Sequence, residues 1–385
     1  MLAKITKLAP LIAITLIPVL LVWFPFFLRL ASFWGIPLPQ NGMATIVANY
    51  DGPLYLVTAK SFYNPEIIKS FEFSLPVQYY AAHFPLFPLL IKLFAAPFGF
   101  PYAMLGITIA SSFLVVYFFY KFIKEYVNDK NAIWLTLVFS VLPARFLIVR
   151  SVGSPEPLFV AAIIASLYYF RREKFLWAGI WGAIAQLTKS PGILLFIAYC
   201  GVILSPKIGK IATESFAKWF KELELKKYLP LLLIPAAALL IFILYGIQLK
   251  DFFAYFHSGD NIHLFFPPFS VFNYSSPWVG TFWLEEVIFV YLFGILTIVR
   301  LFNFRERVLG WFVGIFFASL IFVSHRDLIR YALPITPFVM LAFSETLIKK
   351  EFKIAMAVLA IPIYLFSLAY ISQNVMPISD WAPFL

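Results

Sequence analysis

Long apolar runs separated by short polar segments make up most of the chain. They predict membrane-spanning helices at residues 8–28, 102–122, 131–149, 157–170, 175–188, 191–205, 228–247, 284–300, 308–323, 331–348 and 354–372. A helix needs about 20 apolar residues to cross a hydrocarbon core of ~30 Å. The runs at 157–170 and 175–188 are shorter, so ten to thirteen spans are compatible with the pattern. We therefore expect an all-α, polytopic membrane protein with about eleven transmembrane helices.

Three of the intervals between these spans have a character of their own. The first, residues 29–101, contains apolar stretches such as 87–98 that are too short to span and suit interfacial helices. Residues 248–283 form a second long outer loop, which is aromatic. Residues 206–227 space apolar side chains between lysines, as a cytoplasmic amphipathic helix does. No internal repeat divides the chain, so we expect one integral membrane domain over residues 1–385.

Composition excludes a soluble protein. Hydrophobic residues make up 62% of the chain, charged residues 13%, and the mean hydropathy is +0.88, whereas a soluble domain has about 25% charged residues. The net charge of +11 does not indicate a nucleic-acid partner, because excess Lys and Arg marks the cytoplasmic loops of membrane proteins. Cys200 is the single cysteine, so a disulfide framework within one chain is excluded.

The distribution of basic residues orients the chain. With the N-terminus in the cytoplasm, the inner loops hold 20 of the 30 Lys and Arg residues, as the positive-inside rule predicts. The first span then acts as an uncleaved signal anchor. In this orientation all four histidines and Asp51 lie on the outer side. We expect a multi-pass protein of the plasma membrane with an extracytoplasmic active site.

Asp51 is the first candidate for chemistry. It precedes Gly52 and Pro53, a sequence typical of turns, so it should lie at a bend outside the spanning helices. Its carboxylate is suited to act as a general base that takes a proton from an acceptor hydroxyl. The alternative is a structural Asp that bonds its own turn. The chain has no Asp-x-Asp pair, which disfavours a nucleotide-sugar donor held by a metal.

Five basic residues are candidates for binding a phosphate. Arg145 and Arg150 end the third predicted span, where a cation pairs with an anion or snorkels to the headgroups. Lys189 lies in a turn between two short helices, where it is either a phosphate ligand or a solvated lysine. Arg326 and Arg330 lie four residues apart before the tenth span, where a helix N-terminus also favours anions. The alternative at Arg330 is a local salt bridge.

Polar and aromatic side chains near these positions complete the expected site. Glu156 either caps the fourth predicted span, pairs with an arginine, or binds a sugar hydroxyl. The residues predicted to bind substrate are Tyr50, Tyr55, His83, Glu156, His325 and Tyr331. The histidines at 257 and 263 flank an aspartate at 260, but this spacing is loose and the segment reads as loop, so we expect no metal.

Several segments resemble, in the same order, those of the PIG-V family of membrane mannosyltransferases. They are residues 50–55 (Tyr-Asp-Gly-Pro-Leu-Tyr), 83–90 (His-Phe-Pro-Leu-Phe-Pro-Leu-Leu), 154–159 (Ser-Pro-Glu-Pro-Leu-Phe), 187–192 (Leu-Thr-Lys-Ser-Pro-Gly) and 330–334 (Arg-Tyr-Ala-Leu-Pro). The order and rough spacing match over most of the chain, although residues 205–283 do not match. Tyr50 stands where the family usually has Trp, and Lys189 stands where it usually has Arg.

This resemblance implies a GT-C glycosyltransferase that uses a polyprenyl-phosphate sugar as donor and inverts the anomeric centre. Asp51 would match the acidic residue of the family's first outer loop and act as the base. Lys189 and Arg330 would match family basic positions and hold the donor phosphate, and we add the other three arginines on chemical grounds. The implied partners are the lipid-linked sugar, an acceptor glycan, glycolipid or protein, and membrane lipids, but no nucleic acid.

Two other classes of function are compatible with the sequence. A transporter or flippase of lipid-linked substrates would carry basic residues at mid-membrane depth and paired broken helices. A structural subunit that binds a lipid phosphate would tolerate the loss of Asp51. The gathering of polar residues on one predicted face favours an enzyme over a transporter.

Overall fold

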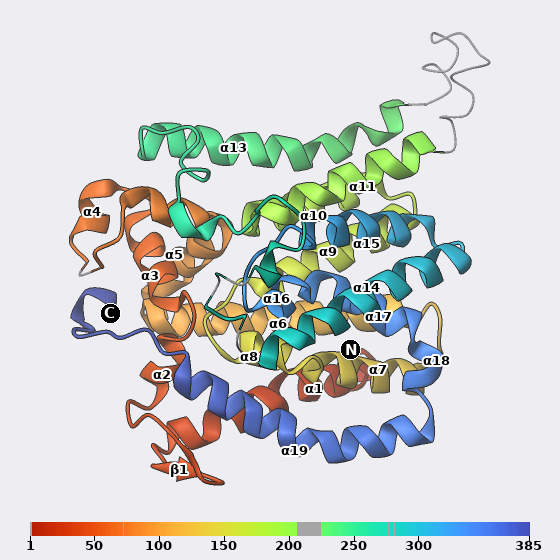
Figure 1. Ribbon diagram of the computed structural model, residues 1–385, viewed down its shortest axis with the longest axis horizontal. Helices are drawn as coiled ribbons and strands as arrows, with labels where there is room; N and C mark the ends of the chain where they lie inside the picture. The colour runs from red at the N-terminus through yellow and green to blue at the C-terminus, as the bar shows by residue number, and fades with distance from the viewer. Residues whose placement is uncertain (1, 72, 206–224, 274, 276, 280–281) are drawn as a thin grey trace. The chain divides into compact units, whose positions relative to one another are not determined.

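The computed structural model describes residues 2–71, 73–205, 225–273, 275, 277–279 and 282–385, and these are mostly helical (Figure 1). The all-α class predicted from the hydrophobic pattern is therefore confirmed. Two short strands, β1 (Ser32–Phe33) and β2 (Ile36–Pro37), pair antiparallel as a hairpin. Most of the predicted amphipathic helix at 206–227 lies outside the described residues.

Backbone packing divides the chain into two compact units, each built from separate stretches of sequence. Unit 1 comprises Met1–Ala161, Phe242–Gly259 and Phe343–Leu385, and unit 2 comprises Ala162–Ile241 and Asp260–Ala342. The hydrophobic pattern did not predict this division, because the period of a helix says which face is apolar but not which helices pack together.

Long apolar helices form the body of unit 1. Helix α1 (Leu2–Phe27) packs against α6 (Phe100–Ile123), α7 (Asp129–Val141), α8 (Ala144–Ser151) and α19 (Lys350–Gln373) (Figure 1). Along α1, Ile17, Leu20 and Leu21 are each more than half exposed. A row of exposed aliphatic side chains on one helix is a face that meets lipid in a membrane protein.

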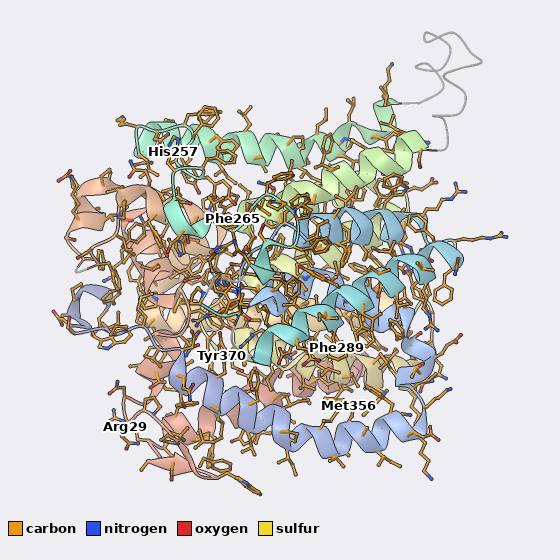
Figure 2. The ribbon with its side chains drawn as sticks, in the orientation of Figure 1. Arg29, His257, Phe265, Phe289, Met356 and Tyr370 are labelled. Atoms are coloured by element: carbon orange, nitrogen blue, oxygen red, sulfur yellow. The ribbon has the colours of Figure 1, made fainter. Side chains whose placement is uncertain are left out.

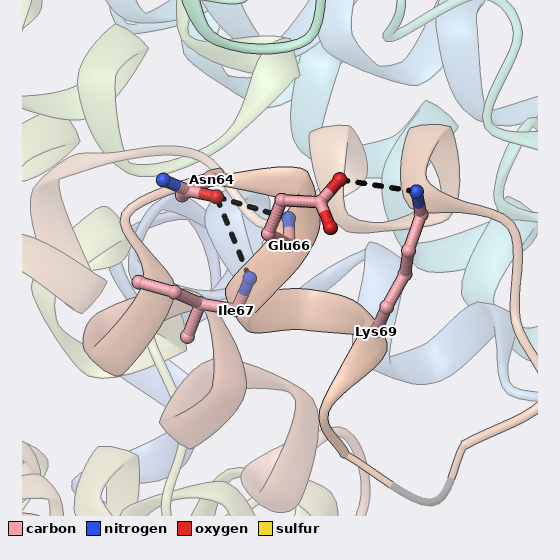
Figure 3. A network of polar contacts seen from close by, with 4 residues as sticks. All are labelled: Asn64, Glu66, Ile67 and Lys69. Atoms are coloured by element: carbon pink, nitrogen blue, oxygen red, sulfur yellow. Dashed lines mark hydrogen bonds and ion pairs between the residues drawn. The ribbon is translucent and has the colours of Figure 1, made fainter.

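The first long loop of the sequence folds into a group of short helices. They are α2 (Met43–Val47), α3 (Gly52–Ser61), α4 (Pro65–Lys69), η1 (Val77–Ala82) and α5 (Leu86–Phe98). Helix α5 packs against both α3 and α6. Asn64 caps α4 by accepting hydrogen bonds from the Glu66 and Ile67 N–H groups, and Lys69 pairs with Glu66 on its surface (Figure 3). The helix predicted at 87–98 is confirmed as α5.

Unit 2 is also a set of packed helices. Helix α15 (Arg307–Leu320) packs against α14 (Glu286–Asn303) and α11 (Ile193–Leu204), and α10 (Phe175–Thr188) packs against η4 (Leu225–Leu232). Arg171 forms hydrogen bonds of 3.0 and 2.9 Å with Glu306. The remaining elements of the described residues are α9 (Glu156–Arg171), η2 (Ser190–Gly192), α13 (Leu233–Gln248), η5 (Gly259–Asn261), η6 (Ser270–Phe272), η7 (Phe282–Glu285), α16 (Leu328–Tyr331), η8 (Leu333–Ile335), α17 (Thr336–Ala342), α18 (Ser344–Leu347) and η9 (Ala382–Phe384).

Several of the predicted spans are not single continuous helices. Among the described residues, five helices are long and apolar enough to cross a membrane, or six if α7 and α8 count as one broken span. The predicted span at 131–149 bends by 74° between α7 and α8, because Pro143 cannot continue a helix. The predicted span at 331–348 is broken into α16, η8, α17 and α18. Shorter apolar helices, such as α10 and α15, occupy other predicted spans.

Candidate functional site

Asp51 lies directly before α3, at the point where the chain enters that helix. Pro53 lies in the first turn of α3. Its ring fixes φ at a helical value, and its missing N–H costs no hydrogen bond, because N–H groups in the first turn have no partner within the helix. The Asp51 carbonyl accepts a hydrogen bond from the Tyr55 N–H at 3.0 Å. Within the described structure its carboxylate makes no capping hydrogen bond, and the residue is partly exposed. The predicted bend is confirmed, and the carboxylate is not used to cap α3.

Two glycines allow close packing beside Asp51. A Cβ on Gly52 would lie 2.2 Å from the Val47 carbonyl oxygen, and a Cβ on Gly153 would lie 2.2 Å from the Met104 Cε. The same Met104 Cε is 3.4 Å from the Cβ position of Gly52. Met104 therefore separates the start of α3 from the segment that leads into α9, and neither glycine has room for a side chain.

Glu156 opens α9 and is only 5% exposed. The Ser154 hydroxyl donates a short hydrogen bond to a Glu156 carboxylate oxygen, and the Ser154 N–H donates to Thr108 Oγ1 at 3.2 Å. A carboxylate in the first turn interacts favourably with the helix dipole. The buried position favours the capping alternative for Glu156 over direct contact with a sugar.

The C-terminal segment holds the residues that precede Asp51. The buried Asn49 donates from Nδ2 to the Ile371 carbonyl at 2.8 Å and accepts at Oδ1 from Asn374 Nδ2 at 3.2 Å. The Tyr50 N–H points to the Asn374 carbonyl at 3.4 Å. Sequence reasoning missed this link, because Asn49 and Asn374 are 325 residues apart and neither has a local motif.

Tyr50 connects this link to an arginine. Its φ of +50° lies in the left-handed region, which costs a non-glycine residue about 1–3 kcal/mol and persists only where neighbouring contacts impose it. The ring centroids of Tyr50 and Tyr370 are 5.6 Å apart, and the Arg145 guanidinium lies 3.8 Å from the Tyr370 centroid. Tyr370, labelled in Figure 2, lies near the C-terminal end of α19. The structure thus places Tyr50 and Arg145 against one shared ring.

Arg150 has a different environment from the one predicted. The residue is fully buried, and its guanidinium donates to the carbonyls of Ser140 at 2.5 Å and Thr15 at 3.1 Å. Two of its three guanidinium nitrogens donate to backbone carbonyls, so the side chain connects neighbouring helices. Arg150 therefore joins α8 to α1 and α7, and its burial disfavours the predicted contact with phosphate, which stays a prediction.

Tyr55 and His83 are also buried, with exposures of 6% and 3%. Their ring centroids are 4.7 Å apart with the planes nearly perpendicular. The Tyr63 hydroxyl donates to the His83 carbonyl at 2.5 Å. These rings therefore pack within the protein, and their predicted contact with substrate stays a prediction.

The second group of predicted site residues lies in unit 2, around His325. The His325 ring lies 4.5 Å from that of His263 and 5.3 Å from that of Tyr331, between centroids. The Asp327 N–H donates to His325 Nδ1 at 3.0 Å, so the neutral imidazole carries its proton on Nε2. Burial, followed by His263 and the nearby arginines, lowers the pKa of His325 to about 3. Its Nε2–H is therefore a neutral donor at pH 7.

The predicted basic residues of unit 2 differ in exposure. Arg326 is exposed, whereas the Arg330 side chain is 13% exposed, with Nε 3.8 Å from an Asp327 carboxylate oxygen. The local salt bridge considered for Arg330 is therefore present, at long distance. Helix α16 has only four residues and begins after Arg326, and binding of phosphate by Arg326 and Arg330 stays a prediction. Lys189 lies in the predicted turn, between α10 and η2.

The possible metal ligands do not form a cluster. His257 Nδ1 lies 2.6 Å from an Asp251 carboxylate oxygen, whereas the ring of His263 packs on His325. Within the described residues, no three His, Cys, Asp or Glu side chains are grouped as metal ligands would be.

The fold is of a known class, the all-α membrane fold of the GT-C type. The chain is similar to ArnT from Cupriavidus metallidurans, solved with bound undecaprenyl phosphate, with a TM-score of 0.55, 14% identity and coverage of 90% of this chain and 63% of ArnT. It is also similar to an oligosaccharyltransferase from Archaeoglobus fulgidus, solved with zinc and sulfate, with a TM-score of 0.50, 16% identity and coverage of 96% and 54%.

The chain therefore spans less than two thirds of the length of either of these proteins. At such identities the likeness shows the fold alone. No family model and no curated protein matches the sequence, so the resemblance to the PIG-V family stays a hypothesis.

Proposed function

We propose that the protein is a membrane glycosyltransferase that transfers a hexose from a polyprenyl-phosphate donor to an acceptor hydroxyl on the extracytoplasmic side. The observation that carries this proposal is the Asp51 carboxylate, partly exposed and not used for capping, on a GT-C type fold. The undecaprenyl phosphate bound to ArnT supports the class of donor. The resemblance to the PIG-V family supports mannose as the sugar.

In the proposed reaction, Asp51 takes the proton of the acceptor hydroxyl while that oxygen attacks the anomeric carbon. The bond from the anomeric carbon to the phosphate oxygen breaks, its electron pair stays on the phosphate, and the anomeric configuration inverts. Cationic side chains would stabilise the charge that develops on the leaving polyprenyl phosphate, and Lys189, Arg326 and Arg330 are the basic residues for which the sequence predicts this role. Asp51 then returns its proton to solvent, and the reaction requires neither a covalent intermediate nor a metal.

The decisive experiment offers the protein, reconstituted in vesicles, a panel of polyprenyl-phosphate hexoses and measures which donor is consumed and which acceptor is glycosylated. Asp51→Asn should reduce transfer at least 100-fold, since a positioned base contributes roughly 10²–10⁴-fold. Thermal unfolding should stay the same, because the Asp51 carboxylate makes no capping bond in the described structure.

Glu66→Gln is the matched control, because it removes an exposed carboxylate from the same loop. It should change neither transfer nor, beyond about 0.5 kcal/mol, stability. Transfer by Asp51→Asn at the wild-type rate, with both substrates saturating, would remove Asp51 as the base.

A transporter or flippase of lipid-linked substrates is the second candidate function. The 74° bend between α7 and α8 favours it, because broken helices are the usual binding elements of transporters. The same vesicles decide between the two functions: a transporter would move the intact donor across the bilayer and leave its sugar–phosphate bond unbroken.

A further inference from the structure

A pocket of about 480 Å³ lies in unit 1 between α2 and the C-terminal segment that follows α19. The residues that line it include Asn41, Ala48, Met376, Ser379 and Trp381. Its volume falls within the ~300–1,000 Å³ of small-molecule sites. The pocket adjoins the hydrogen-bonded contact between the C-terminal segment and the residues that precede Asp51. Met376 and Ala48, which both line the pocket, take part in this contact, because the Met376 N–H donates to the Ala48 carbonyl at 2.8 Å.

The lining of the pocket is uncharged, since the residues that form it are apolar apart from the two polar side chains of Asn41 and Ser379 and the indole of Trp381. An indole ring packs against the C–H face of a sugar, while an amide and a hydroxyl bond to its hydroxyl groups. A phosphate would find no cation among these residues. The chemistry of the lining therefore fits a neutral, hydroxyl-rich ligand and does not fit the head of the lipid donor.

The aromatic wall of the pocket, formed by Trp381, is stabilised by contacts with other residues. The ring centroids of Trp381 and Phe384 are 5.7 Å apart, and those of Phe384 and Phe71 are 5.2 Å apart. The Lys60 ammonium also donates to the Pro383 carbonyl at 2.7 Å. A wall that is ordered before the ligand arrives costs less conformational entropy on binding.

The pocket is close enough to Asp51 to serve the same reaction. Ala48 lines the pocket and precedes Asp51 by three residues, so their Cα atoms are at most about 11 Å apart. This is a distance that a short oligosaccharide spans, with one sugar in the pocket and a neighbouring sugar presenting its hydroxyl to the carboxylate.

We propose that this pocket is the acceptor subsite, and that it binds one sugar residue of a neutral glycan acceptor against Trp381. The inference rests on the proposed glycosyltransferase function, for which it names the class of acceptor. It also assigns the C-terminal segment, which follows the last long helix, a direct part in substrate binding.

The test compares Trp381→Ala and Trp381→Phe with Trp34→Ala, a control that removes an indole 73% exposed elsewhere in unit 1. Trp381→Ala should raise the KM for a mannose-containing acceptor about tenfold or more, the factor expected for one aromatic contact. Trp381→Phe should recover most of this loss. The KM for donor and the thermal unfolding of all three variants should match the wild type.

Binding of mannobiose to the protein in lipid nanodiscs supplies a readout that does not depend on transfer. Wild type and Trp34→Ala should bind this probe, and Trp381→Ala should not. If the wild type transfers no sugar from any donor, the proposed function fails. Binding of mannobiose alone then tests whether the pocket is a sugar-binding site. An unchanged acceptor KM in Trp381→Ala, a parallel loss of stability, or no binding of mannobiose by the wild type would overturn the subsite.

Discussion

At the scale of single residues, the proposed base and the proposed phosphate ligands have different surroundings. Asp51 is partly exposed at the start of a helix, so water and an acceptor can both reach it. Arg330 is mostly buried, close to Asp327 and 5.5 Å from the centroid of the Tyr331 ring. A guanidinium presents five N–H donors in a planar fork, a geometry that matches the oxygens of a phosphate.

Arg330→Ala should raise the KM for the donor about 10- to 100-fold, because charge-assisted hydrogen bonds contribute roughly 1.5–3 kcal/mol. The acceptor KM should stay constant. Steady-state titrations of each substrate at saturating levels of the other measure the two effects.

Asp327→Asn separates binding from structure at this position, because it weakens the contact with Arg330 and keeps the guanidinium. We expect lower stability with little change in the donor KM. If Arg330→Ala affects the two substrates equally and loses the same stability as Asp327→Asn, the arginine is structural.

His325 makes the stability of unit 2 depend on pH. Its pKa is lowered from 6.5 to about 3 in the folded protein, so as the pH falls the unfolded chain binds the proton first. The contribution of His325 to stability is therefore complete above pH 6.5 and is lost as the pH falls toward 3, by at most about 1.4 kcal/mol per pH unit. Between pH 7 and pH 5, the melting temperature of His325→Gln should fall less than that of the wild type. Equal falls would show that His325 titrates normally.

At the scale of elements, the site in unit 1 depends on the junction between the start of α3 and the end of α19. The left-handed Tyr50 is stabilised there by Asn49, Asn374 and Tyr370. Strained residues persist only when their neighbours impose them. The last turn of α19 therefore positions the backbone that carries Asp51, although it provides no acid or base.

Asn374→Ala should lower stability by about 1–3 kcal/mol, because it leaves the buried Asn49 amide oxygen without this donor. It should also lower kcat about tenfold with the donor KM unchanged, as Asp51 loses its geometry. Gln373→Ala, which changes the exposed neighbouring residue, is the control and should leave both quantities at wild-type values. A kcat for Asn374→Ala equal to that of the control would show that the junction stabilises the fold only.

At the scale of the whole molecule, the GT-C type fold and the lipid-facing rows of apolar side chains describe a protein that lies within a bilayer. Its orientation remains the prediction drawn from the basic residues. The charges of the loops decide orientation during insertion, before the helices pack.

Labelling of single cysteines tests this orientation in intact cells. In a Cys200→Ala background, Glu66→Cys should react with a membrane-impermeant maleimide added outside, since this side chain is 83% exposed in the predicted outer loop. Glu351→Cys, exposed in a predicted inner loop, should react only after permeabilisation. The opposite pattern would place Asp51 on the cytoplasmic side.

The sequence by itself determined the all-α class and the long apolar helices. Apolar runs placed α6, α14 and α19, and the C-terminal end of α1, close to their observed limits, because the length of an apolar helix follows from local sequence. Turn chemistry placed Asp51 at a bend, because Gly-Pro cannot continue a helix from the residue before it.

Tertiary structure alone decided which residues surround Asp51 and which candidates are buried. Asn49 pairs with Asn374, and Tyr50 and Arg145 contact one shared ring. The buried Arg150 bonds to a carbonyl of another helix. Each of these contacts joins segments more than 90 residues apart. Contacts of this kind depend on how helices pack, and the packing energy is summed over many side chains. For this reason no local pattern in the sequence records them.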